Sequence, residues 1–282
     1  MPLHLKSVDI RHGPRWVADG FRAFAKRPLA LGLLFLVFLA AVALITAVLP
    51  LVGSMLQLMT MPLLSLGYMV ATQSAMLAGP VPPGQFIDPL RGDPARRRAL
   101  LLLCASYGVL AFALMMLCTW VSDDALARLQ TLMAKGDATR AKIEALLDEP
   151  GVTRAAWLFA VLGTALSVPY WFAPALVHWG GQGAVQSLFS STLALWRNKG
   201  AFTAFVAAWV AMVSVVFGAL LLIFGAGPFG SALLMPAALL LSTVFYVSQL
   251  FAFNDCFGGA AALTGAADGP PGAVNEPPGG GG

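Results

Sequence analysis

The hydrophobic pattern of this chain is dominated by four long segments that lack charged side chains. Residues 28–87, 99–122, 155–196 and 200–254 contain no Asp, Glu, Lys or Arg. A hydrocarbon core about 30 Å thick needs about 20 apolar residues per helix, and soluble folds do not require uncharged segments of this length. The pattern therefore predicts an all-α, polytopic helical membrane protein.

Proline and glycine divide these segments into six transmembrane helices. Pro50 and Gly53 interrupt the first segment, residues 225–228 interrupt the last, and the third changes character at residues 178–181. The predicted spans are residues 29–49, 55–78, 99–121, 155–176, 201–224 and 229–253. They form two groups of three, residues 29–121 and 155–253.

Two amphipathic segments precede spans. Residues 14–27, inside the N-terminal segment 1–28, place Val17, Phe21 and Phe24 on one helical face. In the segment near 184–197, an apolar face lies opposite a polar one; the apolar residues are Val185, Leu188, Phe189, Thr192, Leu195 and Trp196, and the polar ones Gln186, Ser187, Ser190 and Ser191. Both segments are predicted as helices in the cytoplasmic interface with their aromatic faces toward lipid. The alternative for each is an extension of the following span.

The chain following each amphipathic segment is also similar. A span, a Pro/Gly/Ser turn, a Met-Pro pair and a second span follow in both cases, with Pro62 in the first copy and Pro236 in the second. This order fits two parallel repeats. Chance similarity between interrupted apolar segments is the alternative.

The remaining parts are one long connection and a tail. Residues 122–154 form an external loop whose apolar residues recur at helical spacing, so it is either a partly helical hairpin or a solvated linker. Residues 254–282 are rich in Gly and Pro and predict a disordered cytoplasmic tail.

Composition and charge agree with a membrane protein and set its orientation. Hydrophobic residues make up 59% of the chain and charged residues 11%. The net charge of +4 is too small to indicate a nucleic-acid partner. With the N-terminus inside, 12 of the 17 Lys and Arg residues lie in the cytoplasm, which favours cytoplasmic N- and C-termini. The first span is long enough for a retained signal anchor.

Several motifs carry a resemblance to a known family. They are Trp16, Gly20, Phe21, Phe24, Arg27 and Pro28, then residues 48–53, Pro62, Leu63, Leu64 and Gly67, residues 171–177, and finally Trp196, Arg197 and Asn198. The chain resembles an uncharacterised family of proteobacterial six-span inner-membrane proteins. More distantly, it is similar to the membrane domains of YciC-like proteins and of some glycerophosphodiester phosphodiesterases. The resemblance implies a bacterial inner-membrane location and no established activity, because no phosphodiesterase domain accompanies it.

No motif for catalysis, a cofactor or a metal is present. H-E-x-x-H, G-x-S-x-G and the phosphate-binding G-x-x-x-x-G-K-[ST] pattern are all missing. His4, His12 and His178 are scattered, and the three cysteines give no disulfide framework. We therefore expect no catalytic, cofactor-binding or metal-binding residue. His178 remains either an ordinary interfacial histidine or a ligand or proton shuttle.

Polar residues within the predicted spans are few and uncharged. We interpret most of them as interhelical hydrogen-bond partners or interface anchors; they are Gln57, Gln73, Ser106, Tyr107, Tyr170, Tyr246 and Gln249. Gln249, Asn254 and Asp255 form a polar cluster that we attribute to helix termination. Trp residues near both ends of the spans fit aromatic belts. Arg96, Arg97 and Arg98 enforce topology or bind anionic headgroups.

Three functions remain open. The first is a non-enzymatic inner-membrane protein whose partners are the lipid bilayer, including anionic lipid headgroups, or proteins that the sequence does not identify. The second is a channel or facilitator for an uncharged or amphipathic solute, lined by the spans that Pro50, Pro62, Pro169, Pro174 and Pro236 break. The third, a lipid-modifying enzyme, is disfavoured by the lack of paired carboxylates. We therefore expect no enzymatic activity.

Overall fold

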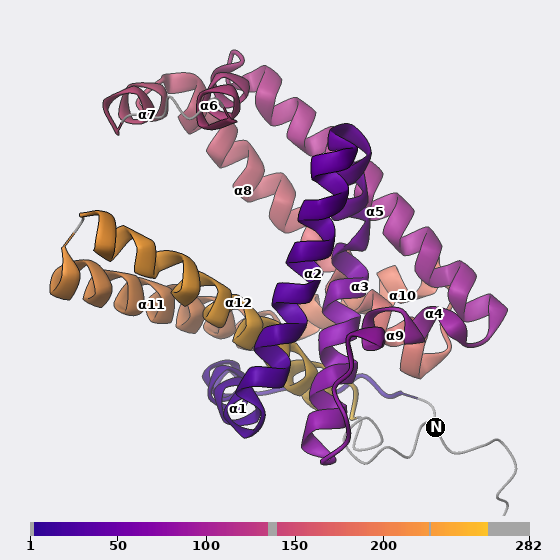
Figure 1. The fold of residues 1–282 in the computed structure, drawn as a ribbon. Helices are drawn as coiled ribbons and strands as arrows, with labels where there is room; N and C mark the ends of the chain where they lie inside the picture. The colour runs from indigo at the N-terminus through magenta and orange to yellow at the C-terminus, as the bar shows by residue number, and fades with distance from the viewer. Residues whose placement is uncertain (1–2, 135–139, 226, 259–282) are drawn as a thin grey trace, which may run out of the picture.

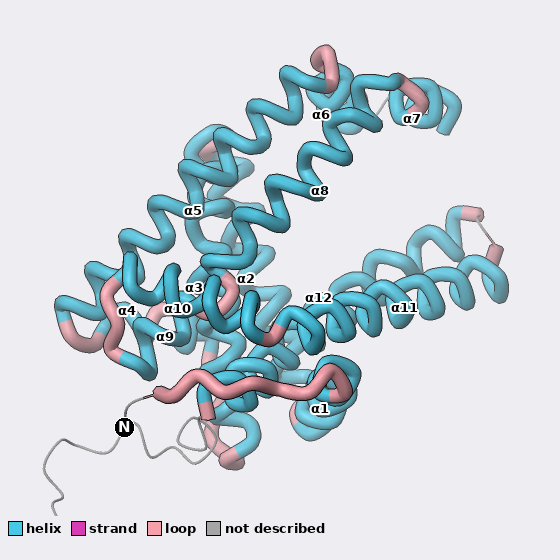
Figure 2. The backbone as a smooth tube through the Cα atoms, turned by 180° about the vertical axis from the view of Figure 1, so that it is seen from behind, coloured by secondary structure: helices cyan, strands magenta, loops and turns pink. Residues whose placement is uncertain are grey.

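The computed structural model describes residues 3–134, 140–225 and 227–258, and every regular element in these ranges is helical (Figures 1 and 2). Six segments are long and apolar enough to cross a membrane, which confirms the all-α, polytopic class. The helices are α1 (His12–Lys26), α2 (Pro28–Val48), α3 (Pro50–Met76), η1 (Pro83–Phe86), α4 (Asp88–Arg91), α5 (Pro94–Val121), α6 (Ala125–Ala134), α7 (Arg140–Leu147), α8 (Pro150–Tyr170), α9 (Ala173–Gly180), α10 (Ala184–Arg197), α11 (Lys199–Phe224) and α12 (Pro228–Phe257).

The helices that form the spans begin earlier than hydropathy predicts. Only Leu49 separates α2 from α3, because Pro50 occupies the first position of a helix, where its missing N–H costs nothing. Residues 50–53 are therefore helical, and the expected turn there is wrong. Likewise, α5 begins at Pro94 because the Asp93 carboxylate accepts hydrogen bonds from the backbone N–H groups of Ala95 and Arg96, both at 3.3 Å.

The fourth span is broken between α8 and α9. Pro169 lacks an N–H, and the chain leaves the helix at residues 171–172. Ser191 of α10 satisfies the exposed backbone groups: its hydroxyl accepts from Phe172 N–H and donates to the Val168 carbonyl, both at 3.0 Å. A buried backbone group without a partner costs about 1–3 kcal/mol, so this one side chain stabilises the break.

The last helix continues past the expected end of the sixth span. α12 runs through Asn254 and Asp255 to Phe257, and Gly258 in a left-handed conformation (φ 66°) ends it. Our attribution of the polar cluster to helix termination is therefore wrong, since Asp255 accepts a hydrogen bond from Trp16 Nε1 at 2.7 Å. Residues 254–257 are helical rather than part of a disordered tail, and residues 259–282 lie outside the described residues.

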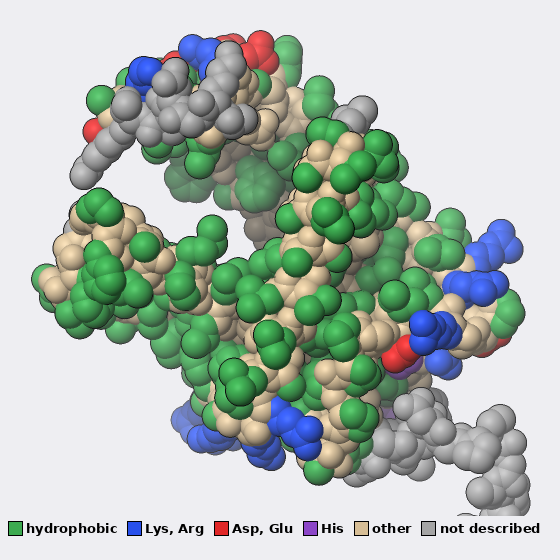
Figure 3. Space-filling model, viewed as in Figure 1, with side chains coloured by type: hydrophobic (Ala, Val, Ile, Leu, Met, Phe, Trp, Pro, Cys, Tyr) green, Lys and Arg blue, Asp and Glu red, His purple; other side chains and the backbone are tan. Residues whose placement is uncertain are grey.

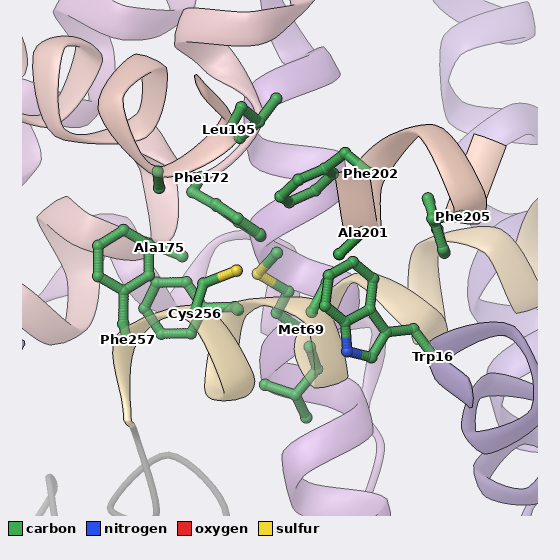
Figure 4. Packing of buried hydrophobic residues seen from close by; sticks show 14 of the residues in the cluster. Trp16, Met69, Phe172, Ala175, Leu195, Ala201, Phe202, Phe205, Cys256 and Phe257 are labelled. Carbon is green, nitrogen blue, oxygen red and sulfur yellow. The ribbon is translucent and has the colours of Figure 1, made fainter. Parts of the chain in front are cut away.

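Three hairpins, α2–α3, α5–α8 and α11–α12, rise from a common base; the first two pack together through α3 and α5, and α11–α12 diverges from them (Figures 1 and 2). The base holds a hydrophobic core made from α1, α9, α10, the first turns of α11 and the last turns of α12. Figure 4 shows the Trp16 ring reaching from α1 into this core. Helices α6 and α7 connect the far ends of α5 and α8, in the loop that the sequence left as either a hairpin or a linker.

Helix α1 faces its surroundings differently from our prediction, whereas the apolar face of α10 is exposed as predicted. α1 packs on α11 and α12. Val17, expected to face lipid, is buried. A side chain at Gly13 would collide with the backbone of Ala201 and Phe205. On α10, the expected apolar residues Val185, Phe189 and Trp196 are exposed.

The polar face of α10 also differs from the prediction. Ser187 and Ser191, expected in water, are fully buried. The reason is local, because each serine hydroxyl has a backbone carbonyl acceptor nearby, and that of Ser191 also completes the break between α8 and α9.

Candidate functional site

A groove of about 870 Å³ lies between the α5–α8 hairpin and α11, with α10 at its base. Figure 3 shows the space between the α11–α12 hairpin and α8 open to the side. Along α8 the groove runs from Trp171 at the base to Phe159, twelve residues or about 18 Å at 1.5 Å per residue. One leaflet is half of the roughly 30 Å hydrocarbon core, so the groove is about as long as one leaflet is thick.

The groove wall is mainly apolar, and three of its hydroxyl-bearing residues bond within their own helices. Thr164, Ser167 and Thr192 each donate to the carbonyl four residues earlier in their own helix, at 2.6, 2.7 and 2.9 Å. Their hydroxyls are therefore satisfied, and what they present to the groove is carbon. Gly163 has no side chain to fill the groove, and an added Cβ there would touch only the Phe159 ring, at 3.7 Å.

A single charged residue lines the base end of this groove among the described residues, and it is basic. Lys199 begins α11, and its Nζ lies 5.3 Å from the centroid of the exposed Trp196 ring. A cation above an aromatic face at the end of an apolar groove matches an amphipathic, negatively charged ligand.

A second, polar pocket of about 510 Å³ brings together three residues from the sequence analysis. Gln73 reaches it from α3, Arg96 from α5 and His178 from α9. Ser74 of α3, Gln85 of η1 and Asp88 of α4, which sequence reasoning did not single out, complete its polar lining. Figure 3 shows acidic, basic and histidine side chains side by side near α4 and α9.

The other polar candidates have separate partners. Tyr170 donates to the Ser106 hydroxyl at 2.8 Å and packs edge-on against Tyr107, which joins α5 to α8. Tyr246 stacks on Tyr68, Gln249 accepts from Ser65, and Gln57 is exposed on α3. Among the residues that the structure describes, no group of three or more His, Cys, Asp or Glu side chains could hold a metal ion.

Sequence reasoning missed two residues that organise the base. Ser191 appeared only as part of a polar face, and hydropathy carries no signal for its role at the break. Asn198 belonged to a recognised motif, but without a function. Its side chain accepts from Val8 N–H at 2.7 Å and donates to the Lys6 carbonyl at 3.1 Å, so it fastens the N-terminal segment to the start of α11.

The comparisons with known proteins give one relative. A protein of Burkholderia thailandensis named a probable inner membrane protein is 32% identical over 260 residues, which cover 91% of this chain and 94% of the relative. No protein-family model and no solved structure matches the chain. The relative's name gives a location and no activity.

Proposed function

Because this chain belongs to the inner-membrane protein family of that Burkholderia relative, we propose that it is a non-enzymatic, lipid-binding protein of the inner membrane. The groove between α8 and α11 is the observation that carries the proposal. Its apolar wall suits an acyl chain, and its lateral opening lets a lipid enter from the bilayer. Lys199 at the base end favours a lipid with a negatively charged headgroup.

A channel or facilitator has less support. The prolines expected to break pore-lining helices are absent from the groove lining among the described residues, and Pro50 and Pro174 lie in the first turns of α3 and α9. A groove open to the side along its length exposes a solute to lipid rather than guiding it between two aqueous phases. The geometry therefore favours lipid as the occupant.

Filling the groove should remove bound lipid without unfolding the protein. In Gly163→Leu, the new side chain has room at its Cβ and extends into the groove. We expect about tenfold less co-purifying lipid, the change that corresponds to a loss of 1.4 kcal/mol in binding free energy. Native mass spectrometry of the full chain released from lipid nanodiscs measures the lipid retained per protein.

Two further variants make this experiment specific. Gly218→Leu places the same side chain on an open face of α11 outside the groove and should retain lipid like the wild type. Lys199→Gln should keep bound lipid but lower its anionic fraction. Equal retention by Gly163→Leu and wild type would contradict the proposal, as would a dimer that occupies the groove in place of lipid.

We also propose that the base of the three hairpins faces the cytoplasm. α1, the Arg96–Arg98 turn and the α10–α11 junction all lie at this end, and each carries basic residues. A reporter that works only in the cytoplasm should be active when fused after Gly272. A reporter that works only in the periplasm should be active when fused within residues 134–138. Activity in the opposite compartments would reverse the orientation.

A further inference from the structure

We propose that the polar pocket beside α4 and α9 binds a phosphate-type oxyanion, independently of the lipid groove. The pocket is polar, whereas the groove is apolar, and no residue lines both. Its walls come from the end of α3, from η1 and α4, from the first turns of α5 and from α9, so five separate elements shape it.

The walls of the pocket are held in place by bonds within the connection from α3 to α5. Ser74 donates from its hydroxyl to the Pro80 carbonyl at 2.6 Å, and Gln85 Nε2 donates to the same carbonyl at 3.1 Å. Ala78 takes a left-handed conformation (φ 58°), and its carbonyl accepts from Arg27 at 3.1 Å. The connection is therefore folded against α3, and Arg27, at the end of α1, is bonded to it.

Two deeply buried glutamines line the pocket, and their side-chain amides are incompletely hydrogen-bonded by the protein. Gln73 and Gln85 are each only 6% exposed. Among the described residues, the Gln73 side chain makes no hydrogen bond and Gln85 Oε1 has no donor. Native proteins rarely leave a buried acceptor such as Gln85 Oε1 unsatisfied, so its presence in a pocket that the Gln73 amide also lines indicates a polar ligand.

The charges around the pocket favour an anion. Asp88 is paired with Arg91 at 3.1 Å, which neutralises the one acidic lining residue. Arg96 has no ion pair among the described residues, and its Nε is buried without an acceptor. A guanidinium with free donors is the usual partner of phosphate or carboxylate oxygens.

The unpaired acceptor distinguishes between these two anions. Gln85 Oε1 requires a donor on the ligand. A protonated phosphate oxygen supplies one, and an ionised carboxylate does not. The shared chemistry is therefore a phosphate group, carried either by a soluble molecule or by the headgroup of a lipid in the adjacent leaflet.

Thermal stabilisation of the full chain tests this proposal, because a ligand that binds only the folded state raises the unfolding temperature. Inorganic phosphate is titrated into protein in nanodiscs of uncharged or zwitterionic lipid, and nanodiscs containing phosphatidate form the second arm. We expect Arg96→Gln to weaken the response about tenfold, the factor that corresponds to 1.4 kcal/mol. Arg98→Gln removes the same charge from an exposed position on the same helix and should respond like the wild type.

The two arms separate the sources of the phosphate. A response to free phosphate that Arg96→Gln lacks supports a soluble ligand, and a response confined to phosphatidate that Arg96→Gln lacks supports a lipid headgroup. Gln73→Leu, which keeps the pocket charge, should also lose the response. The proposal is overturned if neither probe stabilises the wild type, or if Arg96→Gln and wild type respond alike. Neither result bears on lipid in the groove, because Gly163→Leu leaves this pocket unchanged.

Discussion

Replacing Trp16 with alanine should lower the free energy of unfolding by about 3–5 kcal/mol, the usual cost of truncating a buried Trp. Trp16 is 1% exposed, and its ring centroid lies 5.3 Å from that of Phe202 and 5.9 Å from that of Phe205. The truncation would leave a cavity in the base core and remove the hydrogen-bond donor to Asp255. Denaturant unfolding of the full chain in mild detergent measures the change.

Trp120→Ala is the matched control for this prediction. Trp120 is 75% exposed at the end of α5, and its removal should change the stability by less than about 0.5 kcal/mol. Trp16→Phe separates packing from hydrogen bonding, because it keeps most of the ring and loses the donor to Asp255. Equal losses in Trp16→Ala and Trp120→Ala would show that α1 is not part of the folded base.

Asn198→Leu should release the N-terminal segment from the base. The substitution removes the partners of Val8 N–H and the Lys6 carbonyl, and each such hydrogen bond contributes about 0.5–1.5 kcal/mol to stability. Lys6 N–H also donates to the Cys256 carbonyl at 2.7 Å, so the segment would lose two of three anchoring bonds. We expect faster tryptic cleavage after Lys6 in the native protein.

The exposed amide of Gln186 on α10 provides the comparison. Gln186→Leu removes a side-chain amide that bonds no described residue, and cleavage after Lys6 should keep its wild-type rate. Unchanged cleavage in Asn198→Leu would mean that the bond from Lys6 to Cys256 alone holds the segment.

Hydropathy predicted the six spans because the bilayer requires every spanning helix to be largely free of charged side chains. It could not tell lipid-facing from protein-facing positions, since both are apolar. Val17 and Phe189 illustrate this limit: both were expected to face lipid, but only Phe189 is exposed, whereas Val17 is buried on α11 and α12.

The candidate sites were less predictable than the spans. Gln73, Arg96 and His178 were each noticed in the sequence, but they lie on three different helices, and only the fold brings them to one pocket. The groove depends on how two hairpins diverge, which no local pattern records. Gly163 and Lys199, which contribute to it, carry no signal of their own.

The break between α8 and α9 has a consequence for how the chain is made. The hydroxyl that satisfies Phe172 N–H belongs to a residue 19 positions later. A ribosome adds about 5–20 residues per second, so Ser191 is synthesised on the order of one to four seconds after Phe172. During this time Phe172 N–H lacks its final acceptor. Until Ser191 emerges, water or the insertion machinery must supply these hydrogen bonds, and α9 can reach its final position only after α10 has been synthesised.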